Sequence, residues 1–375
     1  MTWWIVLGVV VVLILVLRSF RPKPGAHHGP PPLRTLRVAS VTRETDDAVK
    51  LELEDPAGGA LPFTAGQFLS LKFELDGETL WRNYSLCSLP GAAGPVAVAV
   101  KRTATGKVSN HIHANVKAGD LIQVRGPSGR FVCEAEPGLE RHHVLIAGGS
   151  GITPMMAILQ AVLDGEPLSR VTLIYGNRRQ ADVIFQARLD ELASQSHGRL
   201  KVVHALAEPP EGWTGISGVL DPSALAKALE ATGISPVDPQ VRFYLCGPQP
   251  MMDGARAYLL ERGAAADAVL EERFTVPVHT VSTAGAQPVT FIHRGQRTVV
   301  EVPPNQTILE AGLASGLSLD HSCTIGVCGT CMLKKCSGQV QLNEGHCLSD
   351  AEIAQGYVLI CSAHPTEPTE FEVED

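Results

Sequence analysis

The chain has 375 residues, which is too long for one ordinary core and favours two or three domains. Its 39 acidic and 31 basic side chains give a net charge of −8 with no basic arm, and this disfavours nucleic acid as a partner. The nine cysteines are odd in number and no secretory cleavage site precedes them, so a disulfide framework is disfavoured and a reducing compartment is expected.

Residues 1–21 are predicted to form a membrane anchor. Trp3 to Leu17 contains no polar side chain, and a helix over it spans about 22 Å of the roughly 30 Å hydrocarbon core, so flanking residues must complete the crossing. A cleaved signal peptide would carry basic residues before the apolar run and a small-residue cleavage site after it, and neither is present. A buried core helix is the other alternative, and the Pro- and Gly-rich stretch that follows fits it poorly.

The charges around this segment predict its orientation. Arg18, Arg21 and Lys23 all follow the apolar run, and the positive-inside rule then places the remainder of the chain in the cytoplasm. We therefore expect a single-pass protein of the inner (cytoplasmic) membrane with its globular domains in the cytoplasm. Residues 22–33, which are rich in proline and glycine, are predicted to be a linker.

Residues 34–138 are predicted to form an antiparallel β-barrel. Short runs rich in Val, Leu and Phe show period-two alternation and are separated by Gly, Pro and Asp turns. The runs are TLRVASVTRE, VKLELEDP, QFLSLKFEL, PVAVAVKR and DLIQVRGP.

Residues 139–274 change pattern and predict a parallel α/β domain. Strands alternate with helical stretches, which is typical of a parallel sheet covered by helices on both faces. The expected strands are HVLIA, VTLIYG, LKVVHAL and VRFYLCG, and the expected helices are PMMAILQAVLD, DVIFQARLDELA, PSALAKALE and PMMDGARAYLLERG.

Residues 275–287 lack helical periodicity and are rich in small residues, so they are predicted to be a second linker. Residues 288–375 form the third predicted domain. A hairpin over residues 289–303 and a helix over residues 307–316 precede a group of cysteines. The acidic end EPTEFEVED is predicted to be a solvated tail that steers docking to a basic partner surface.

Four of the cysteines have the spacing of metal ligands. Cys323, Cys328 and Cys331 follow C-x4-C-x2-C, and Cys361 follows after 29 intervening residues. Plant-type [2Fe–2S] clusters use this spacing. Four thiolates suit zinc as well, but structural zinc sites commonly pair two C-x2–4-C knuckles, and the second knuckle is missing here. Cys336 is a spare thiol and a weaker candidate ligand.

Glycines in the same loop suit the tight curl that a cluster requires. Gly326 and Gly329 permit unusual backbone angles and a close approach of N–H groups to the cluster sulfides. Residues 288–375 resemble a plant-type ferredoxin domain of the β-grasp fold. This resemblance implies that the four cysteines hold a [2Fe–2S] cluster that carries one electron at low potential.

The stretch WRNYSLCSLP carries a second candidate site, in the predicted barrel. Arg82, Tyr84 and Ser85 form R-x-Y-S at the end of a predicted strand, with Asn83 between them. By itself such a group is more often packing than a ligand pocket. R-x-Y-S resembles the flavin signature of the ferredoxin–NAD(P)H reductase superfamily. That resemblance implies that Arg82 pairs with the flavin pyrophosphate, Tyr84 lies against the isoalloxazine ring and Ser85 hydrogen-bonds near N5.

Two later stretches resemble the superfamily's other flavin segments. VKRTATGKVSNHI contains a G-x-x-S turn that opens a predicted helix, whose N–H groups suit phosphate, and GPSGRF adds Gly126 and Gly129. The resemblance implies FAD as the flavin, with FMN as the alternative. The residues that it assigns to the flavin are Lys101, Gly106, Val108, Ser109 and Asn110.

The stretch HVLIAGGSGITPMMAIL predicts a dinucleotide site. A buried strand, a glycine turn and a helix follow one another, which is a layout that binds pyrophosphate. Pro154 replaces the third glycine of G-x-G-x-x-G, so the general dinucleotide fingerprint is not satisfied. The stretch does resemble the superfamily's own G-G-S/T-G-I-T-P loop, which implies that Gly149, Gly151 and Thr153 face NADH or NADPH.

Three further stretches add to this nucleotide site. Arg178 and Arg179 follow the next strand in YGNRR, where an arginine favours the 2′-phosphate of NADPH; surface arginines are common, so the donor stays open. LCGPQP resembles the C-G-P near the nicotinamide, and EERF resembles an E-x-F domain ending. The resemblance assigns Cys246, Gly247, Pro248, Glu272 and Phe274, of which Cys246 equally suits a core thiol. Tyr84, Ser85 and Cys246 are the candidate catalytic residues.

Together the three sites predict an electron converter. A nicotinamide gives up a hydride, a cluster accepts one electron at a time, and a flavin can do both. Over residues 34–375 the chain is similar to reductase components of oxygenase and desaturase systems with a C-terminal ferredoxin domain, such as phenylacetyl-CoA epoxidase reductases. The expected function is electron transfer from NAD(P)H through flavin and cluster to a partner oxygenase, hydroxylase or desaturase. The predicted anchor favours a membrane diiron enzyme as that partner.

Two alternative functions remain open. A self-sufficient NAD(P)H-dependent reductase of ferric chelates or quinones would use the same cofactors. A non-catalytic, redox-sensing membrane module would use the flavin and the cluster to control an interaction. Rapid reduction of quinone without a membrane partner would favour the first alternative, and negligible turnover of NAD(P)H would favour the second.

Overall fold

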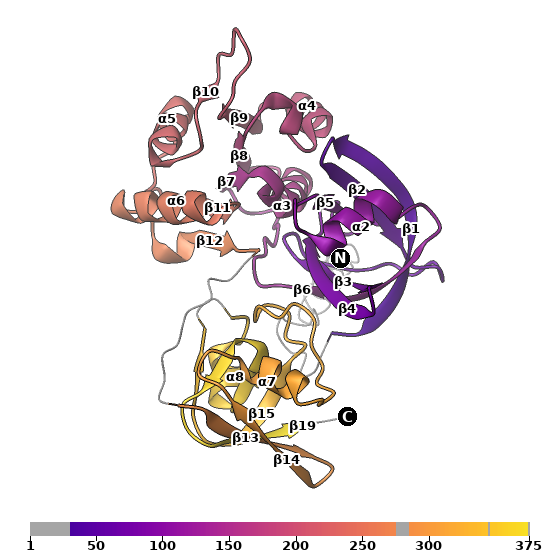
Figure 1. Cartoon of the computed structure of the whole chain (residues 1–375). Coiled ribbons are helices and arrows are strands. Elements are labelled where there is room, and N and C mark those ends of the chain that lie inside the picture. Colours follow the sequence, from indigo (N-terminus) through magenta and orange to yellow (C-terminus); the bar gives the residue numbers. More distant parts are fainter. Residues whose placement is uncertain (1–30, 275–284, 344–345, 374–375) are drawn as a thin grey trace, which may run out of the picture.

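The structure, a computed structural model, describes residues 31–274, 285–343 and 346–373. Three bodies follow one another along the chain, and the third lies below the first two in Figure 1. The predicted anchor, nearly all of the first linker and residues 275–284 of the second lie outside the described residues. Within the described ranges, no helix is long and apolar enough to cross a bilayer.

The first body is a six-stranded antiparallel sheet that curls into a barrel. Its strand order is β4-β3-β6-β1-β2-β5, and a bridge between Leu86 and Val98 brings the two edges together. Period-two alternation places side chains such as Leu51 and Leu53 on the inner face, where they are buried. The predicted antiparallel barrel is confirmed. Its elements are β1 (Leu33–Thr45), β2 (Ala48–Glu54), β3 (Phe68–Leu75), β4 (Glu78–Ser85), β5 (Val96–Lys101), α2 (Lys107–Asn115) and β6 (Leu121–Ser128).

The second body is a parallel sheet with the order β10-β9-β8-β7-β11-β12. The chain builds outward from β7 in one direction and then returns to its other side, so β7 and β11 form the switch point at which such sheets bind ligands. The predicted parallel α/β domain is confirmed. Its elements are β7 (His142–Gly148), α3 (Ile152–Gly165), β8 (Arg170–Asn177), α4 (Gln186–Gln195), β9 (Leu200–Leu206), β10 (Ile216–Ser217), α5 (Pro222–Thr232), β11 (Val241–Cys246), α6 (Gln249–Glu261) and β12 (Val269–Glu272).

One helix boundary in this body differs from the prediction. The helix expected from Asp182 begins at Gln186. Residues 180–182 form a separate 3₁₀ turn, and Phe185 has a φ of 65°, in the left-handed region that an α-helix cannot include. The apolar spacing alone did not reveal this break.

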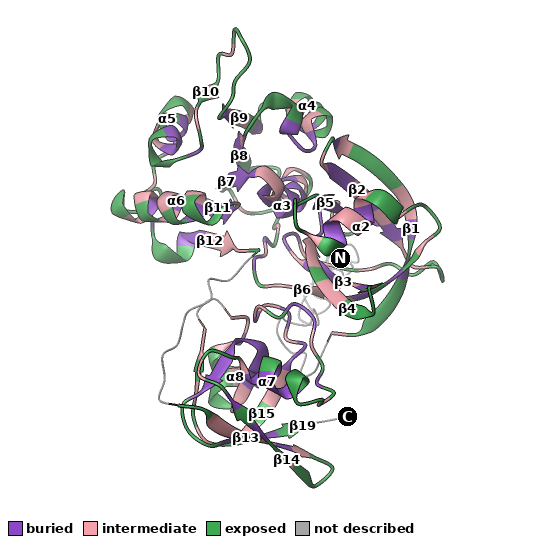
Figure 2. Cartoon of the chain, in the orientation of Figure 1, coloured by how far each residue is buried: buried purple, intermediate pink, exposed green. Residues whose placement is uncertain are grey.

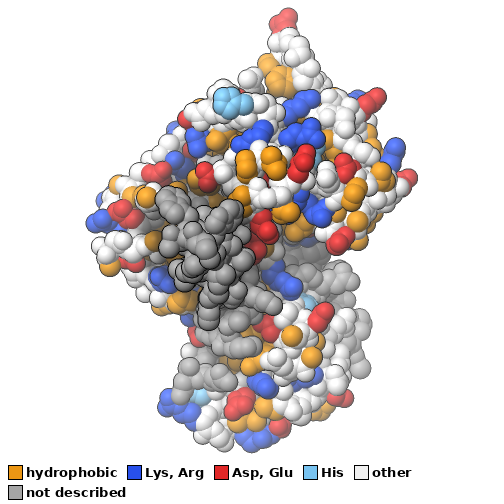
Figure 3. Space-filling view, turned by 180° about the vertical axis from the view of Figure 1, so that it is seen from behind, with side chains coloured by type: hydrophobic (Ala, Val, Ile, Leu, Met, Phe, Trp, Pro, Cys, Tyr) orange, Lys and Arg blue, Asp and Glu red, His pale blue; other side chains and the backbone are white. Residues whose placement is uncertain are grey.

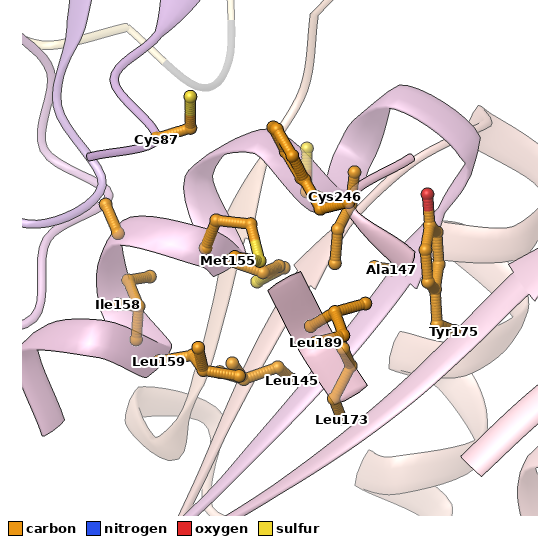
Figure 4. Packing of buried hydrophobic residues seen from close by; sticks show 14 of the residues in the cluster. Cys87, Leu145, Ala147, Met155, Ile158, Leu159, Leu173, Tyr175, Leu189 and Cys246 are labelled. Atoms are coloured by element: carbon orange, nitrogen blue, oxygen red, sulfur yellow. The ribbon is translucent and has the colours of Figure 1, made fainter. Parts of the chain in front are cut away.

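Helix α3 joins the first two bodies into one core. It packs on the parallel sheet with one face and on the barrel with the other, so Met155 and Ile158 belong to a cluster that also contains Cys87 of the barrel and Leu173 of β8 (Figure 4). Figure 2 shows the buried residues concentrated in the strands and on the inner faces of the helices. Apolar packing therefore fixes the barrel relative to the nucleotide sheet.

The third body is a mixed five-stranded sheet with the order β14-β13-β19-β15-β17, against which α7 packs. β13 and β19 are parallel, and the remaining pairs are antiparallel. This arrangement agrees with the predicted β-grasp domain. Its elements are β13 (Gln287–His293), β14 (Gln296–Val302), α7 (Ile308–Ala314), β15 (Met332–Ser337), β16 (Val340–Leu342), α8 (Asp350–Ala354), β17 (Tyr357–Leu359), β18 (Ala363–Pro365) and β19 (Thr369–Val373).

The acidic end of the chain is not a solvated tail, and that prediction was wrong. Residues Thr369–Val373 form β19 at the centre of the sheet, between β13 and β15. Phe371 is fully buried, whereas Glu370 and Glu372 alternate onto the outer side. The alternation in TEFEV is a strand pattern that the high acidic content obscured.

Candidate active site and cluster loop

A cavity of about 920 Å³ lies where the three bodies meet. Strands β3 and β4 and the loop after β6 form one wall, α6 and β12 form the second, and the cysteine-rich loop forms the third. Its volume is in the range of pockets that hold cofactor-sized ligands. The predicted site residues that line it are Arg82, Asn83, Ser85, Gly129, Glu272, Phe274 and Cys323.

Ser85 and Glu272 meet across the boundary between the first two bodies. The Ser85 hydroxyl donates a hydrogen bond of 2.9 Å to Oε2 of Glu272. Glu272 ends β12 and pairs in register with Cys246, which ends β11. Burial raises the pKa of Glu272 to about 8, although the hydrogen bond from Ser85 lowers it. This carboxyl group therefore holds a proton near neutral pH at the wall of the cavity.

Cys246 and Tyr84 lie deeper than the cavity wall. Cys246 is completely buried, and burial, together with the charge of Glu272, raises the pKa of its thiol well above the ordinary value. It is therefore a core thiol and not a thiolate nucleophile. Tyr84 is half-buried against the barrel core. Neither is among the described residues that line the cavity.

The turn before α2 closes on itself through its side chains. The Ser109 hydroxyl accepts a hydrogen bond from the Thr103 N–H at 3.2 Å and donates to the Gly106 carbonyl at 3.3 Å. Asn110 Nδ2 donates to the same carbonyl at 2.9 Å, and Val108 is buried in the barrel core. Because the helix has no side-chain cap, its first-turn backbone N–H groups are the donors that suit a phosphate.

Lys101 and Arg82 are the two basic side chains of the barrel that were predicted to bind cofactor. Lys101 ends β5, and its Nζ lies 3.7 Å from Oδ2 of Asp47. A Cβ added at Gly149 would lie 3.9 Å from that Nζ, so Lys101 reaches the nucleotide loop. Arg82 is exposed, and its Nη1 donates to the Trp81 carbonyl at 2.7 Å. The fork of its guanidinium thus lies at the open side of the cavity.

Glycines allow the two strands at the switch point to approach each other. A Cβ added at Gly151 would lie 2.0 Å from the carbonyl oxygen of Cys246, and one added at Gly247 would lie 2.9 Å from the Gly148 nitrogen. Only a residue without a side chain fits at these positions. They let the carboxyl ends of β7 and β11 pack closely at the switch point, where sheets of this kind bind ligands.

Two other residues of this loop have structural roles here. The Thr153 side chain is buried, and its hydroxyl donates to the Ser150 carbonyl at 3.0 Å, so it closes the turn and does not face the crevice. Pro248 is the N-cap of α6. Its ring would meet a Cβ added at Gly148 at 2.7 Å, which again requires glycine there.

Arg178 and Arg179 share one carboxylate. Nε of Arg178 lies 3.2 Å from Oδ2 of Asp182, and Nη2 of Arg179 lies 3.0 Å from Oδ1. Both guanidiniums are exposed, and the group of three keeps a net positive charge. Next to them, the nitrogen and oxygen of the Asn177 side-chain amide are buried and have no hydrogen-bond partner among the described residues. The amide lies close to the Tyr175 hydroxyl. An amide of this kind suits a ligand hydroxyl or phosphate.

The four predicted ligand cysteines lie together in the third body. All four are buried, and none of the described cysteines forms a disulfide. The Cys323 side chain lies near those of Cys328 and Cys361, and the Cys361 side chain also lies near that of Cys331. The contacts from Cys328 and Cys361 lower the pKa of Cys323. Cys336 is exposed on β15, away from this group.

This donor set suits two irons better than one ion. Among the described residues, no three His, Cys, Asp or Glu side chains are grouped closely enough to bind a single metal ion. A [2Fe–2S] cluster distributes four thiolates over two irons, so a wider group fits it. Gly326 and Gly329 have φ of 79° and 76°, and the N–H of Val327 donates to Sγ of Cys323 at 3.4 Å. The loop therefore curls around the thiols with N–H groups directed inward.

Several residues of the site were not predicted from the sequence. Phe68 packs against Cys323 and Cys328, and Arg130 lines the cavity and donates to carbonyls of the third body. No local pattern predicts contacts between segments so far apart in the chain. Asp182 did have a signal, because it follows the two arginines by three and four residues, a spacing that favours ion pairs.

Three families match successive parts of the chain. Residues 35–133 match the oxidoreductase FAD-binding domain, and residues 145–257 match the oxidoreductase NAD-binding domain. Residues 291–366 match the 2Fe-2S iron-sulfur cluster binding domain. Each match falls on one of the three bodies, in the order barrel, parallel sheet and β-grasp.

Two curated proteins are similar along most of their length. One is a component of the 1,2-phenylacetyl-CoA epoxidase of Escherichia coli K12, which is 34% identical over 343 residues, covering 88% of this chain and 94% of its own. The other is the 3-ketosteroid-9-alpha-monooxygenase ferredoxin reductase component of Mycolicibacterium smegmatis, which is 34% identical over 347 residues, with coverages of 88% and 94%.

Solved structures show the same architecture. Phthalate dioxygenase reductase, described as a modular structure for electron transfer from pyridine nucleotides to [2Fe-2S], has a TM-score of 0.57 and 25% identity, over 91% of this chain and 98% of its own. An intact type IV self-sufficient cytochrome P450 monooxygenase has a TM-score of 0.69 and 23% identity, and it shares the fold. The alignment covers 94% of this chain but only 43% of that longer one.

Proposed function

The chain belongs to the ferredoxin–NAD(P)H reductase superfamily, in the group with a C-terminal [2Fe–2S] domain. From this membership we propose that it is a reductase serving a partner oxygenase, hydroxylase or desaturase, and from the apolar run near its N-terminus we propose that it is anchored in a membrane. Its cofactors are FAD, a [2Fe–2S] cluster and NAD(P)H. When bound, the flavin takes a hydride from the nicotinamide and gives up single electrons to the cluster. The observation that carries the proposal is the cavity, to which the barrel, the nucleotide sheet and the cysteine loop each give one wall.

In this proposal the barrel holds the flavin. Arg82 binds the pyrophosphate at the open side of the cavity through its rigid fork of donors. The backbone N–H groups that begin α2 bind phosphate, because the side chains of that turn are occupied with one another. The glycines at 151 and 247 let the strand ends pack closely at the switch point, and Gly149, beside Lys101, is placed there to face the dinucleotide.

The Ser85 and Glu272 pair controls charge at the inner wall. A flavin bound in this cavity would gain electron density on taking a hydride, and a neutral Glu272 would place no negative charge at the cavity wall. The raised pKa of Glu272 keeps it protonated near neutral pH. Ser85, hydrogen-bonded to that carboxyl group, presents its hydroxyl to the cavity.

An oxygenase-type partner is supported by the relatives and by charge. The two curated relatives are named as parts of an epoxidase and a monooxygenase. Residues 288–375 contain eleven acidic and four basic side chains, so this domain carries nearly all of the net charge of −8. Over the barrel and the nucleotide domain, by contrast, the two signs are interspersed (Figure 3). The acidic domain would dock on a basic partner surface.

A partner at the membrane is supported by the sequence. The run from Trp3 to Leu17 without a polar side chain, followed by Arg18, Arg21 and Lys23, supports an anchor with the catalytic domains in the cytoplasm. A membrane diiron desaturase or hydroxylase fits such an anchor. Tethering both proteins to one membrane raises their effective concentration without any new contact.

The test compares the full-length protein with a variant lacking residues 1–21. An anaerobic titration with NADH and then NADPH should bleach the flavin and cluster absorbance of both proteins equally. In membranes that contain the partner, substrate turnover should fall by about tenfold in the truncated variant, because the tether is lost. Cys361→Ser is the matched control, since it should stop turnover without affecting the anchor.

Two outcomes would contradict parts of this proposal. Equal turnover by full-length and truncated protein would count against the anchor and leave the reductase role standing. Rapid reduction of quinone or ferric chelate by the purified protein, with no gain from partner-containing membranes, would instead support a self-sufficient reductase.

A further inference from the structure

The cysteine loop and the segments beside it lie against the barrel through three contacts of different kinds. Phe68 packs on the loop, Arg125 forms an ion pair of 3.0 Å with Asp320, and Arg130 donates to backbone carbonyls. The Asp320 side chain is 65% exposed and that of Arg125 only 14%, so solvent screens the carboxylate and weakens the ion pair, although the guanidinium itself is largely buried.

Phe68 limits how closely the loop approaches. Its side chain is buried and packs against Cys323 and Cys328, with Ile325 and Val327 beside it. Dispersion contacts of this kind are short-ranged and lack direction. They set a minimum separation between barrel and loop, but they do not prevent the loop from sliding or retreating.

Arg130 supplies the directional contact. Its Nη1 donates to the Leu348 carbonyl at 2.8 Å and to the Cys347 carbonyl at 3.2 Å. The N–H of Cys347 in turn donates to the Gly326 carbonyl at 2.8 Å, and Gly326 lies in the loop between Cys323 and Cys328. A continuous series of hydrogen bonds therefore connects the cavity wall, which Arg130 lines, with the cluster loop.

We propose that Arg130 is the positioning residue that holds the cluster loop at a fixed distance from the flavin cavity. Electron transfer slows steeply as the distance between donor and acceptor grows, so a loop released by a small amount transfers poorly. The guanidinium suits this task because it is always charged and presents its donors in a rigid plane. The inference concerns transfer inside the chain, where each hydride from NAD(P)H leaves as two single electrons, and it does not depend on the partner.

Four variants separate this role from general docking. Arg130→Gln removes the charge, and Arg130→Lys keeps the charge without the planar fork. Asp320→Asn removes only the exposed ion pair. Arg37→Gln is the matched control, because Arg37 is a barrel arginine that pairs with Glu54 at 2.7 Å and makes no contact with the cysteine loop among the interactions of the described residues.

Anaerobic stopped-flow absorbance resolves flavin reduction by NAD(P)H from the later reduction of the cluster. We expect Arg130→Gln to slow cluster reduction by about tenfold to a hundredfold while flavin reduction stays unchanged. Arg130→Lys should give an intermediate rate. Asp320→Asn and Arg37→Gln should leave both steps within about twofold of wild type.

Readouts other than activity identify the cause. The midpoint potentials of flavin and cluster and the EPR signal of the reduced cluster should match wild type, whereas amide hydrogen exchange at Cys347 and Leu348 should rise. Cluster reduction at wild-type speed in Arg130→Gln would overturn the proposal, as would a slow step with a shifted cluster potential. If the Arg130→Gln protein does not retain its cluster, the Arg130→Lys protein provides the test. Cluster reduction at the wild-type rate in Arg130→Lys would then overturn the proposal.

Discussion

At the scale of single residues, the chemistry of this site depends on pairs that come from different bodies. Ser85 belongs to the barrel and Glu272 to the nucleotide sheet, yet their side chains are 2.9 Å apart. Burial at this junction raises the pKa of Glu272 to about 8, which an exposed glutamate would not show. Packing of the two bodies against each other is therefore what keeps the Glu272 carboxyl group protonated near neutral pH.

Replacing Glu272 tests this directly. In wild type, flavin reduction by NAD(P)H should slow by about tenfold as pH rises through about 8, because the ionised carboxylate then opposes added electron density. Glu272→Gln should abolish this inflection. Ser85→Ala should move it to higher pH, since the hydrogen bond that lowers the pKa of Glu272 is lost. Stopped-flow rates over the pH range provide the measurement, and an unchanged inflection in Glu272→Gln would assign it to another group.

At the scale of elements, glycines decide how strand ends meet at the nucleotide site. Gly151 ends the turn from β7 into α3, and the carbonyl of Cys246 at the end of β11 occupies the space that a Cβ would need. The motif predicts a glycine turn, but the reason for this glycine lies in the neighbouring strand. Its partner is distant in the chain and adjacent in the sheet.

Gly151→Ala should therefore damage both stability and nucleotide binding. The added methyl group would lie 2.0 Å from the Cys246 oxygen, and we expect the free energy of unfolding to fall by roughly 1–3 kcal/mol. The dissociation constant of NAD(P)H should rise by about tenfold as the crevice distorts. Gly138→Ala is the control, because a Cβ added there meets nothing within 4 Å. Chemical denaturation and fluorescence titration would show whether the two variants differ.

At the scale of the whole molecule, a cluster of buried polar side chains lies where the chain passes from the barrel into the nucleotide sheet. Glu166 is completely buried and accepts hydrogen bonds from Arg141, from His143 at 3.0 Å and from Ser169 at 2.6 Å. Burial alone would raise the pKa of Glu166, but these bonds lower it to about 2. The apolar core around α3 holds the barrel and the nucleotide sheet together, and the Glu136 N–H, which donates to Glu166 at 3.3 Å, ties the connecting segment to the buried polar residues.

The depressed pKa of Glu166 predicts a pH dependence of stability. The group contributes on the order of 3 kcal/mol above its unfolded pKa of about 4.5, and this contribution is lost as pH falls toward its folded pKa of about 2. Glu166→Gln should lower the free energy of unfolding by roughly 3–5 kcal/mol at neutral pH and lose part of this acid dependence. Urea denaturation between about pH 6 and about pH 3 measures both effects, because the loss begins near the unfolded pKa and grows toward the folded one. Glu140→Gln, at an exposed position nearby, should match wild type, and equal acid sensitivity of both variants would contradict the assignment.

Much of the fold and of the site was predictable because it depends on neighbours in the chain. Cys323, Cys328 and Cys331 have a spacing that one loop can wrap around two irons, and R-x-Y-S lies on one strand. Strand and helix periodicities predicted the barrel and the parallel sheet, and the resemblance of residues 288–375 to plant-type ferredoxins predicted the β-grasp domain. Each of these patterns involves residues that are near one another in the chain, so the geometry of a single strand, helix or loop is enough to bring them together.

The remaining features depend on which faces pack together, which no local pattern contains. β19 is central because Phe371 fills the core of the third body, although its acidic neighbours suggested a tail. The raised pKa of Glu272 and the contacts of Arg130 arise only where separate bodies meet. The sequence by itself determined which cofactors this protein carries, since their ligands are local motifs. Tertiary structure alone decided how those sites face one another, because burial and distance between domains follow from packing.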